Sequence, residues 1–139
     1  MKKFQVALAT ALLALGAATI ARADHGNNNN NETRLKTRLA GGAIQGKTPE
    51  GNAEFRLDSK MRSQFKVEVE HVNLPAGTIL DVAVQHGMTP TIVGHITLNA
   101  FGSGELELQS QDGDTVPAVV GGDMVIVSNA GTPILSGTF

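Results

Sequence analysis

The sequence predicts an all-β domain, folded as an antiparallel β-sandwich or flattened barrel of about eight strands. Three observations lead to this prediction. Apolar and polar residues alternate in "AEFRLD" (53–58), "FKVEVE" (65–70) and "ELELQ" (105–109), which is the period of a half-buried strand. No stretch after Ala23 sustains the apolar stripe of a helix. Short motifs also recur in the two halves of the chain, which indicates an internal repeat.

The first 23 residues have the pattern of a signal peptide. Lys2 and Lys3 precede the apolar run "FQVALATALLALGAATI", and "ARA" then ends at Ala23 with small residues at the cleavage positions. We expect cleavage before Asp24 and export of the remaining chain to the periplasm or the extracellular space. The alternative is an uncleaved anchor, but a polar, Asn-rich segment follows instead of a stop-transfer flank. No Cys follows the apolar run, which excludes a lipoprotein.

The segment "DHGNNNNNE" (24–32) is predicted to be a flexible tether, because five consecutive Asn residues cannot bury apolar surface to offset the entropy of ordering. Residues 33–139 are then expected to form a single β-sandwich domain. This domain contains no Cys, so it must hold together by burial alone. No later stretch is as apolar as the first segment, so we do not expect an integral membrane protein.

The internal repeat divides the domain into two halves, at about 33–86 and 90–139. Matched motifs follow the same order in each half, and three of them are separated by 51 to 54 residues. Each half is expected to supply four short strands, and the two resulting sheets are expected to cover one another's apolar faces. The matches are "GAI" (42–44) with "GHI" (94–96), "GNAEFRL" (51–57) with "GSGELEL" (102–108), "VEV" (67–69) with "VIV" (125–127), and "AGTIL" (76–80) with "AGTPIL" (130–135).

The alternation also predicts which side chains face the core. In the motif "AGT", the Gly is expected at a turn with positive φ that leads into the last strand of each half. The predicted inward residues are Leu35, Leu39, Ala53, Phe55, Leu57, Phe65, Val67, Val69, Leu80, Val82, Val84, Ile92, Ile96, Leu98, Leu106, Leu108, Val125, Val127, Leu135 and Phe139.

Three short segments resemble a known family. "LAGG" (39–42), "PEGNAEFRL" (49–57) and the closing "LSGTF" (135–139) are similar to the CHRD domain, which occurs in chordin and in many exported bacterial proteins. The resemblance spans most of the domain, although the family's central His-x-His element is represented only by His95 in "VGHI". It implies an immunoglobulin-like β-fold and an extracellular binding or matrix role without known catalysis.

Charge is distributed unevenly along the chain. After Ala23, every Lys and Arg lies between Arg34 and Lys66, whereas residues 67–139 contain only acidic charges. One interpretation is structural: basic and acidic strands pair within the domain, at about 0.2–1 kcal/mol for each cross-strand pair.

The other interpretation is a binding surface formed by "RLKTR" (34–38). Arg34, Lys36 and Arg38 alternate with Leu35, Thr37 and Leu39, so one strand face presents three cations in a row. These cations suit an anionic glycan, another anionic envelope component or an acidic protein. They equally suit an edge strand that is protected from aggregation. Nucleic acid is not expected as a partner, because the net charge is −2 and no stacking aromatic residues accompany the cations. The oligomeric state is left open.

Metal and catalytic sites are not predicted. His71, His86 and His95 fall at separate places on the expected strands, which does not suit zinc. In "QDGDT", Asp112 and Asp114, with Asp123 nearby, form a weak calcium candidate, although Asp-Gly is also an ordinary turn signal. The chain has no Cys and no G-x-S-x-G elbow, and no cofactor is expected.

These observations together favour an exported, non-enzymatic binding or structural module of the bacterial cell envelope, with an unknown ligand. Two alternatives remain open. The chain could be a subunit of an extracellular matrix that assembles by pairing of edge strands. More distantly, it could be a small envelope hydrolase.

Overall fold

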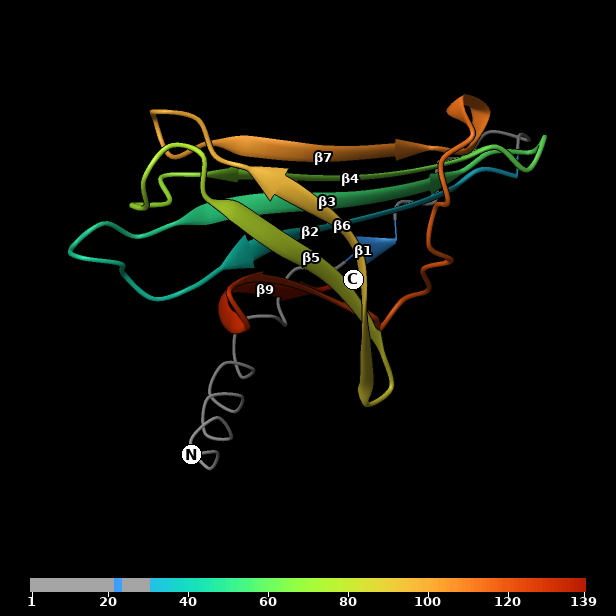
Figure 1. Ribbon diagram of the computed structural model, residues 1–139. Coiled ribbons are helices and arrows are strands. Elements are labelled where there is room, and N and C mark those ends of the chain that lie inside the picture. Colours follow the sequence, from blue (N-terminus) through green and yellow to red (C-terminus); the bar gives the residue numbers. More distant parts are fainter. Residues whose placement is uncertain (1–21, 24–30) are drawn as a thin grey trace.

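The computed structural model describes residues 22–23 and 31–139, and nearly all regular structure in this part of the chain is antiparallel strand (Figure 1). The predicted all-β fold is therefore confirmed. A single turn of 3-10 helix, η2 (Ser110–Asp112), follows β7. The strands are β1 (Arg22–Ala23), β2 (Thr33–Ala40), β3 (Glu50–Leu57), β4 (Ser63–Glu70), β5 (Ile79–His86), β6 (Thr89–Thr97), β7 (Gly104–Gln109), β8 (Met124–Asn129) and β9 (Thr132–Thr138).

The strands form one sheet that curls into a flattened, nearly closed barrel. Their order is β6-β5-β8-β9-β2-β3-β4-β7, and β1 pairs with β2 beside this path. Figure 1 shows β2, β3, β4 and β7 running side by side as one layer, while β5 and β6 cross them at an angle. We call these the β2-β3-β4-β7 layer and the β6-β5-β8-β9 layer.

Glycines allow close approach where the two layers meet. Between β2 and β9 the ladder consists of one residue pair, Ala40 with Ser136. A Cβ on Gly41 would lie 1.8 Å from the carbonyl oxygen of Ile134, and a Cβ on Gly137 would lie 2.2 Å from that of Arg38. No other residue fits at such distances without moving the backbone, so these glycines close this side of the barrel.

The two halves of the chain each supply four strands, but they do not form separate sheets, so this part of the prediction is wrong. Strand β5, from the first half, pairs with β6 and β8, while β7, from the second half, pairs with β4. The two "AGT" motifs share only a local role. Gly77 and Gly131 have the expected positive φ, +89° and +86°, in the turns that precede β5 and β9.

The core lies between the two layers, and most of the predicted inward side chains are buried there. Leu57, Leu106 and Leu108 are only partly buried against this core. Ile92 was predicted to face inward, but its side chain is 57 % exposed. The register shifts between Val82 and Ala83, so that Val82 pairs with Gly94 but Ala83 pairs with Ile92. This bulge inverts the alternation of β6 and turns Ile92 outward.

The predicted signal peptide (1–23) and tether (24–32) fall almost wholly outside the described residues, which include only Arg22, Ala23, Asn31 and Glu32 from them. Arg22 pairs with Lys36, and Ala23 pairs with Leu35, on the edge of β2 that β9 leaves free. Within the described part of the chain, no helix has the length and apolar character needed to cross a membrane.

Candidate functional site

The three predicted cations lie on the outward side of β2. Leu35, Thr37 and Leu39 are buried, so Arg34, Lys36 and Arg38 alternate with them and point away from the core, as the sequence pattern predicts. They belong to a larger surface, which we call the charged face. It is made of the outward side chains of the β2-β3-β4-β7 layer: Arg34, Lys36, Arg38, Glu50, Asn52, Glu54, Arg56, Gln64, Lys66, Glu68, Glu70, Glu105, Glu107 and Gln109.

Two of the three cations bind carboxylates on β3. Nε of Arg34 lies 2.5 Å from Oε2 of Glu54, and an Nη atom of Arg38 lies 3.5 Å from Oε1 of Glu50. Lys36 faces Glu54 in the register, but it forms no ion pair with any residue that the structure describes. Among the described residues, Lys36 is thus the cation of β2 that has no carboxylate partner.

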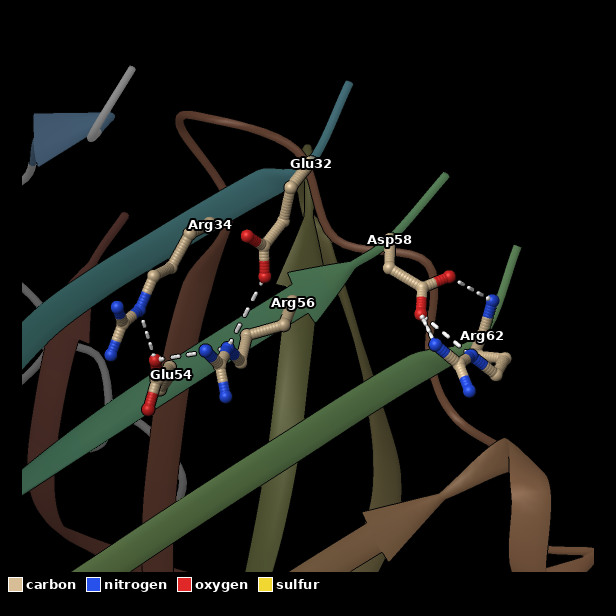
Figure 2. Close-up of polar contacts among 6 residues, drawn as sticks. All are labelled: Glu32, Arg34, Glu54, Arg56, Asp58 and Arg62. Atoms are coloured by element: carbon tan, nitrogen blue, oxygen red, sulfur yellow. Dashed lines mark hydrogen bonds and ion pairs between the residues drawn. The ribbon is translucent and has the colours of Figure 1, made fainter. Parts of the chain in front are cut away.

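The ion pairs extend across the basic end of the charged face (Figure 2). Nε of Arg56 lies 3.7 Å from carboxylate oxygens of both Glu32 and Glu54. Arg34 and Arg56 are direct cross-strand neighbours, and Glu54 lies between their guanidinium groups. The shared carboxylate offsets the repulsion between these two cations.

Next to this network, Asp58 closes the turn between β3 and β4. Its Oδ1 accepts the backbone N–H groups of Lys60 and Arg62, at 2.8 and 3.0 Å, and its Oδ2 accepts Nε–H of Arg62 at 2.6 Å. These bonds hold the pKa of the Asp58 carboxyl below its ordinary value, with the backbone bond from Arg62 as the largest cause.

Across the middle of the charged face, the charges alternate from strand to strand. In the register of the four strands, Lys36 lies directly across from Glu54, Glu54 lies across from Lys66, and Lys66 lies across from Glu107. Nζ of Lys66 also lies 3.0 Å from a carboxylate oxygen of Glu68. This contact raises the pKa of the Lys66 ammonium, and the neighbouring carboxylates of β7 add to the effect.

The opposite end of the charged face is acidic. Glu50 lies directly across from Glu70, which is a like-charge pair, and Nδ1 of His71 lies 2.9 Å from Oε2 of Glu50. The ligand atoms of Glu50, Glu70 and His71 lie within 4.8 Å of one another. Two carboxylates and an imidazole are donors that divalent transition metals accept. Sequence reasoning missed this cluster, because Glu50 joins it only through the register of β3 and β4.

Asp112, Asp114 and Asp123, the weak calcium candidate, do not form a group of ligands in the described part of the chain. Oδ2 of Asp114 accepts the backbone N–H of Gln109, and Asp112 belongs to η2. Asp123 is buried elsewhere and bonds His86 and the backbone N–H of Val120. Among the described residues, only Glu50, Glu70 and His71 form a group of three possible ligands.

The three histidines of the domain lie apart, and each contacts a different carboxylate through Nδ1: His71 with Glu50, His86 with Asp123 and His95 with Asp81. The His86–Asp123 pair resembles two thirds of a hydrolase triad, with Asp123 buried and His86 exposed. Within the part of the chain that the structure describes, however, no hydroxyl group hydrogen-bonds to His86.

Comparison of the chain with models of known protein families, with curated proteins and with solved structures finds no match. The function is therefore inferred from the geometry of the charged face.

Proposed function

We propose that this chain is an exported, non-enzymatic binding or structural module of the bacterial cell envelope, and that the charged face is its contact surface. The observation that carries the proposal is the sorting of charge by strand. The charged residues that β2 turns outward are all cations, whereas those that β7 turns outward are all carboxylates. An exposed ion pair contributes only about 0–1 kcal/mol, so the stability of the fold does not require this sorting.

The proposal of export rests on the signal-peptide pattern of residues 1–23. The resemblance of three segments to the CHRD domain supports the same location and a role without catalysis. The Asn-rich segment (24–32) would then be a flexible tether at the N-terminal side of the domain.

The basic margin of the charged face favours an anionic ligand, such as an acidic glycan or another anionic envelope component. Arg34 and Arg38 are positioned by Glu54 and Glu50, and Lys36 lies between them with its ammonium unpaired among the described residues. A sulfate, phosphate or carboxylate group could therefore bind Lys36 directly, and further such groups along an anionic polymer could bind the outer N–H groups of the two guanidiniums.

Binding to an array of anionic glycans tests the proposal. The triple variant Arg34→Ala, Lys36→Ala and Arg38→Ala should lose binding by at least tenfold, because three cationic contacts are removed. The control variant Lys47→Ala and Lys60→Ala removes two exposed cations outside the four strands and should bind normally. Undiminished binding by the triple variant would remove β2 from the contact surface.

A second candidate function, a matrix subunit that assembles by edge-strand pairing, is favoured by the open edge of β2. Strand β9 pairs with this edge at Ala40 only, and the two residues of β1 pair only with Leu35 and Lys36. Unpaired backbone groups on an edge can accept a strand from another molecule. Sedimentation velocity at increasing concentration would then show open-ended growth, whereas a binding module would show a defined species.

A further inference from the structure

The two outer strands of the charged face carry opposite charges, cations on β2 and carboxylates on β7. Lys36 on β2, and Glu105 and Glu107 on β7, form no ion pair with any described residue. All three side chains are exposed. Two strands, β3 and β4, separate them, so the cations of β2 cannot reach the carboxylates of β7 in the same molecule. A second molecule can bring these margins together.

Only one aligned packing of two such faces matches their charges. If a twofold axis ran across the strands, β2 would lie over β2 of the second copy, and cations would face cations. If the axis runs along the strands, between β3 and β4, then β2 lies over β7 of the second copy, and β3 lies over β4.

The register shows which residues this second arrangement places opposite one another. Lys36 and Glu107 belong to the same row across the sheet, as do Arg38 and Glu105. Because an axis along the strands keeps each row in place, Lys36 faces Glu107 of the second copy, and Arg38 faces Glu105. In the row of Lys36, every charge then lies opposite a charge of the other sign.

We propose that two copies of this chain associate face to face through the charged face, with β2 of each copy over β7 of the other. The inference rests on the proposal that this face is the contact surface, and it names a second copy of the chain as the partner. Packed sheets lie about 10 Å apart, a distance that two long charged side chains can span together.

The size and chemistry of the surface set the strength of the association. Three strands of eight residues and one of six cover roughly 500 Å² on each copy. The interface therefore buries roughly 1,000 Å² in total, at the lower limit for a specific complex. In the last row, Glu50 faces Glu70 of the second copy and opposes binding. The dimer is therefore weak and sensitive to salt, and its dissociation constant rises at least tenfold between low and about 0.5 M salt.

Charge reversal at the two margins provides the test. Two variants are expressed with the N-terminal segment intact, so that any processing takes place. Lys36→Glu with Arg38→Glu makes both margins acidic, and Glu105→Lys with Glu107→Lys makes both margins basic. Their self-association is measured by analytical ultracentrifugation at low salt, beside the unchanged chain. Lys47→Glu with Lys60→Glu reverses two exposed cations outside the four strands and serves as the control.

The unchanged chain and the control variant should dimerise with increasing concentration, and each margin variant alone should remain monomeric. An equimolar mixture of the two margin variants should form a heterodimer, because each acidic margin then meets a basic one. A variant that fails to fold cannot produce this rescue, and circular dichroism identifies it.

Dimerisation of either margin variant as strong as that of the unchanged chain would overturn the inference, as would a mixture that stays monomeric. An unchanged chain that is monomeric at all concentrations would also overturn it. In that last case, glycan binding that depends on β2 would leave the proposed function standing. If the unchanged chain neither dimerises nor binds glycans through β2, the charged face is not a contact surface.

Discussion

Nδ1 of His86 lies 2.6 Å from Oδ1 of Asp123, and this contact joins the end of β5 to the segment that enters β8. The Asp123 side chain is 3 % exposed, whereas that of His86 is 77 % exposed. The other carboxylate oxygen of Asp123 accepts the backbone N–H of Val120 at 3.0 Å. The backbone of Asp123 also accepts the N–H of Phe139. Asp123 therefore holds the C-terminal strand, the loop before β8 and the end of β5 in one place.

Removal of either partner of this pair should destabilise the domain, but by different amounts. Asp123→Ala leaves the N–H of Val120 without its acceptor, and we expect a loss of about 1–3 kcal/mol in the free energy of unfolding. His86→Ala removes an exposed side chain whose place beside Oδ1 of Asp123 water can take, and it should cost less than about 1 kcal/mol. Urea denaturation of both variants measures the difference. Equal losses would contradict the assignment of Asp123 as the anchor.

The like-charge pair at the acidic end of the charged face should weaken the fold. Replacement of Glu70 by Gln removes its repulsion with Glu50, and we expect a gain of about 0.2–1 kcal/mol in metal-free buffer with a chelator. Glu107→Gln is the matched control, because Glu107 lies across from Lys66 and its loss should be neutral or destabilising. Thermal unfolding at low salt distinguishes the two variants. A loss of stability in Glu70→Gln would show that the pair is not repulsive.

The close contact between β2 and β9 should not tolerate a side chain. A Cβ on Gly41 would lie 1.8 Å from the backbone oxygen of Ile134, so Gly41→Ala must shift β9 and should cost about 3 kcal/mol or more. A Cβ on the neighbouring Gly42 meets nothing within 4 Å, and Gly42→Ala should be nearly neutral. Chemical denaturation compares the two. Similar free energies of unfolding for the two variants would show that the barrel does not close through a tight contact at Gly41.

The lowered pKa of Asp58 predicts a pH dependence with a defined sign. A carboxyl whose pKa is lower in the folded state stabilises the fold above its ordinary value of 3.8, and this contribution disappears as the pH falls through the folded pKa. Asp58→Ala should therefore be less stable than the unchanged chain at pH 7, and the difference should shrink below about pH 4. Denaturation curves between pH 7 and pH 3 test this. A difference that is constant with pH would exclude an ionic role for Asp58.

Local patterns in the sequence predicted the strands and most of the core, because alternation directly reports which side of a strand is buried. The same logic failed at Ile92, where a bulge in β6 inverts the alternation. Val72 and Val119 are buried outside the strands and follow no period, so no pattern could identify them.

The sequence predicted only part of the candidate site, because local patterns do not show which distant strands lie side by side. The outward position of Arg34, Lys36 and Arg38 is a local property of β2 and could be predicted. The proximity of Glu50 to Glu70, and the position of β7 beside β4, depend on pairing between distant segments. The apparent repeat suggested a different pairing, in which each half of the chain formed its own sheet.

The central claim is that another molecule covers the charged face when the protein performs its function. The chain has no Cys, so a single thiol can report the accessibility of one position. Asn52→Cys places it on the charged face, and Thr97→Cys places it on β6 as a control; both positions are exposed. The rate of thiol modification is measured for the isolated, dilute protein and for the protein mixed with envelopes of its source organism. Modification of Asn52→Cys should slow at least several-fold in the mixture, while that of Thr97→Cys stays constant; an unchanged rate at Asn52→Cys would contradict the claim.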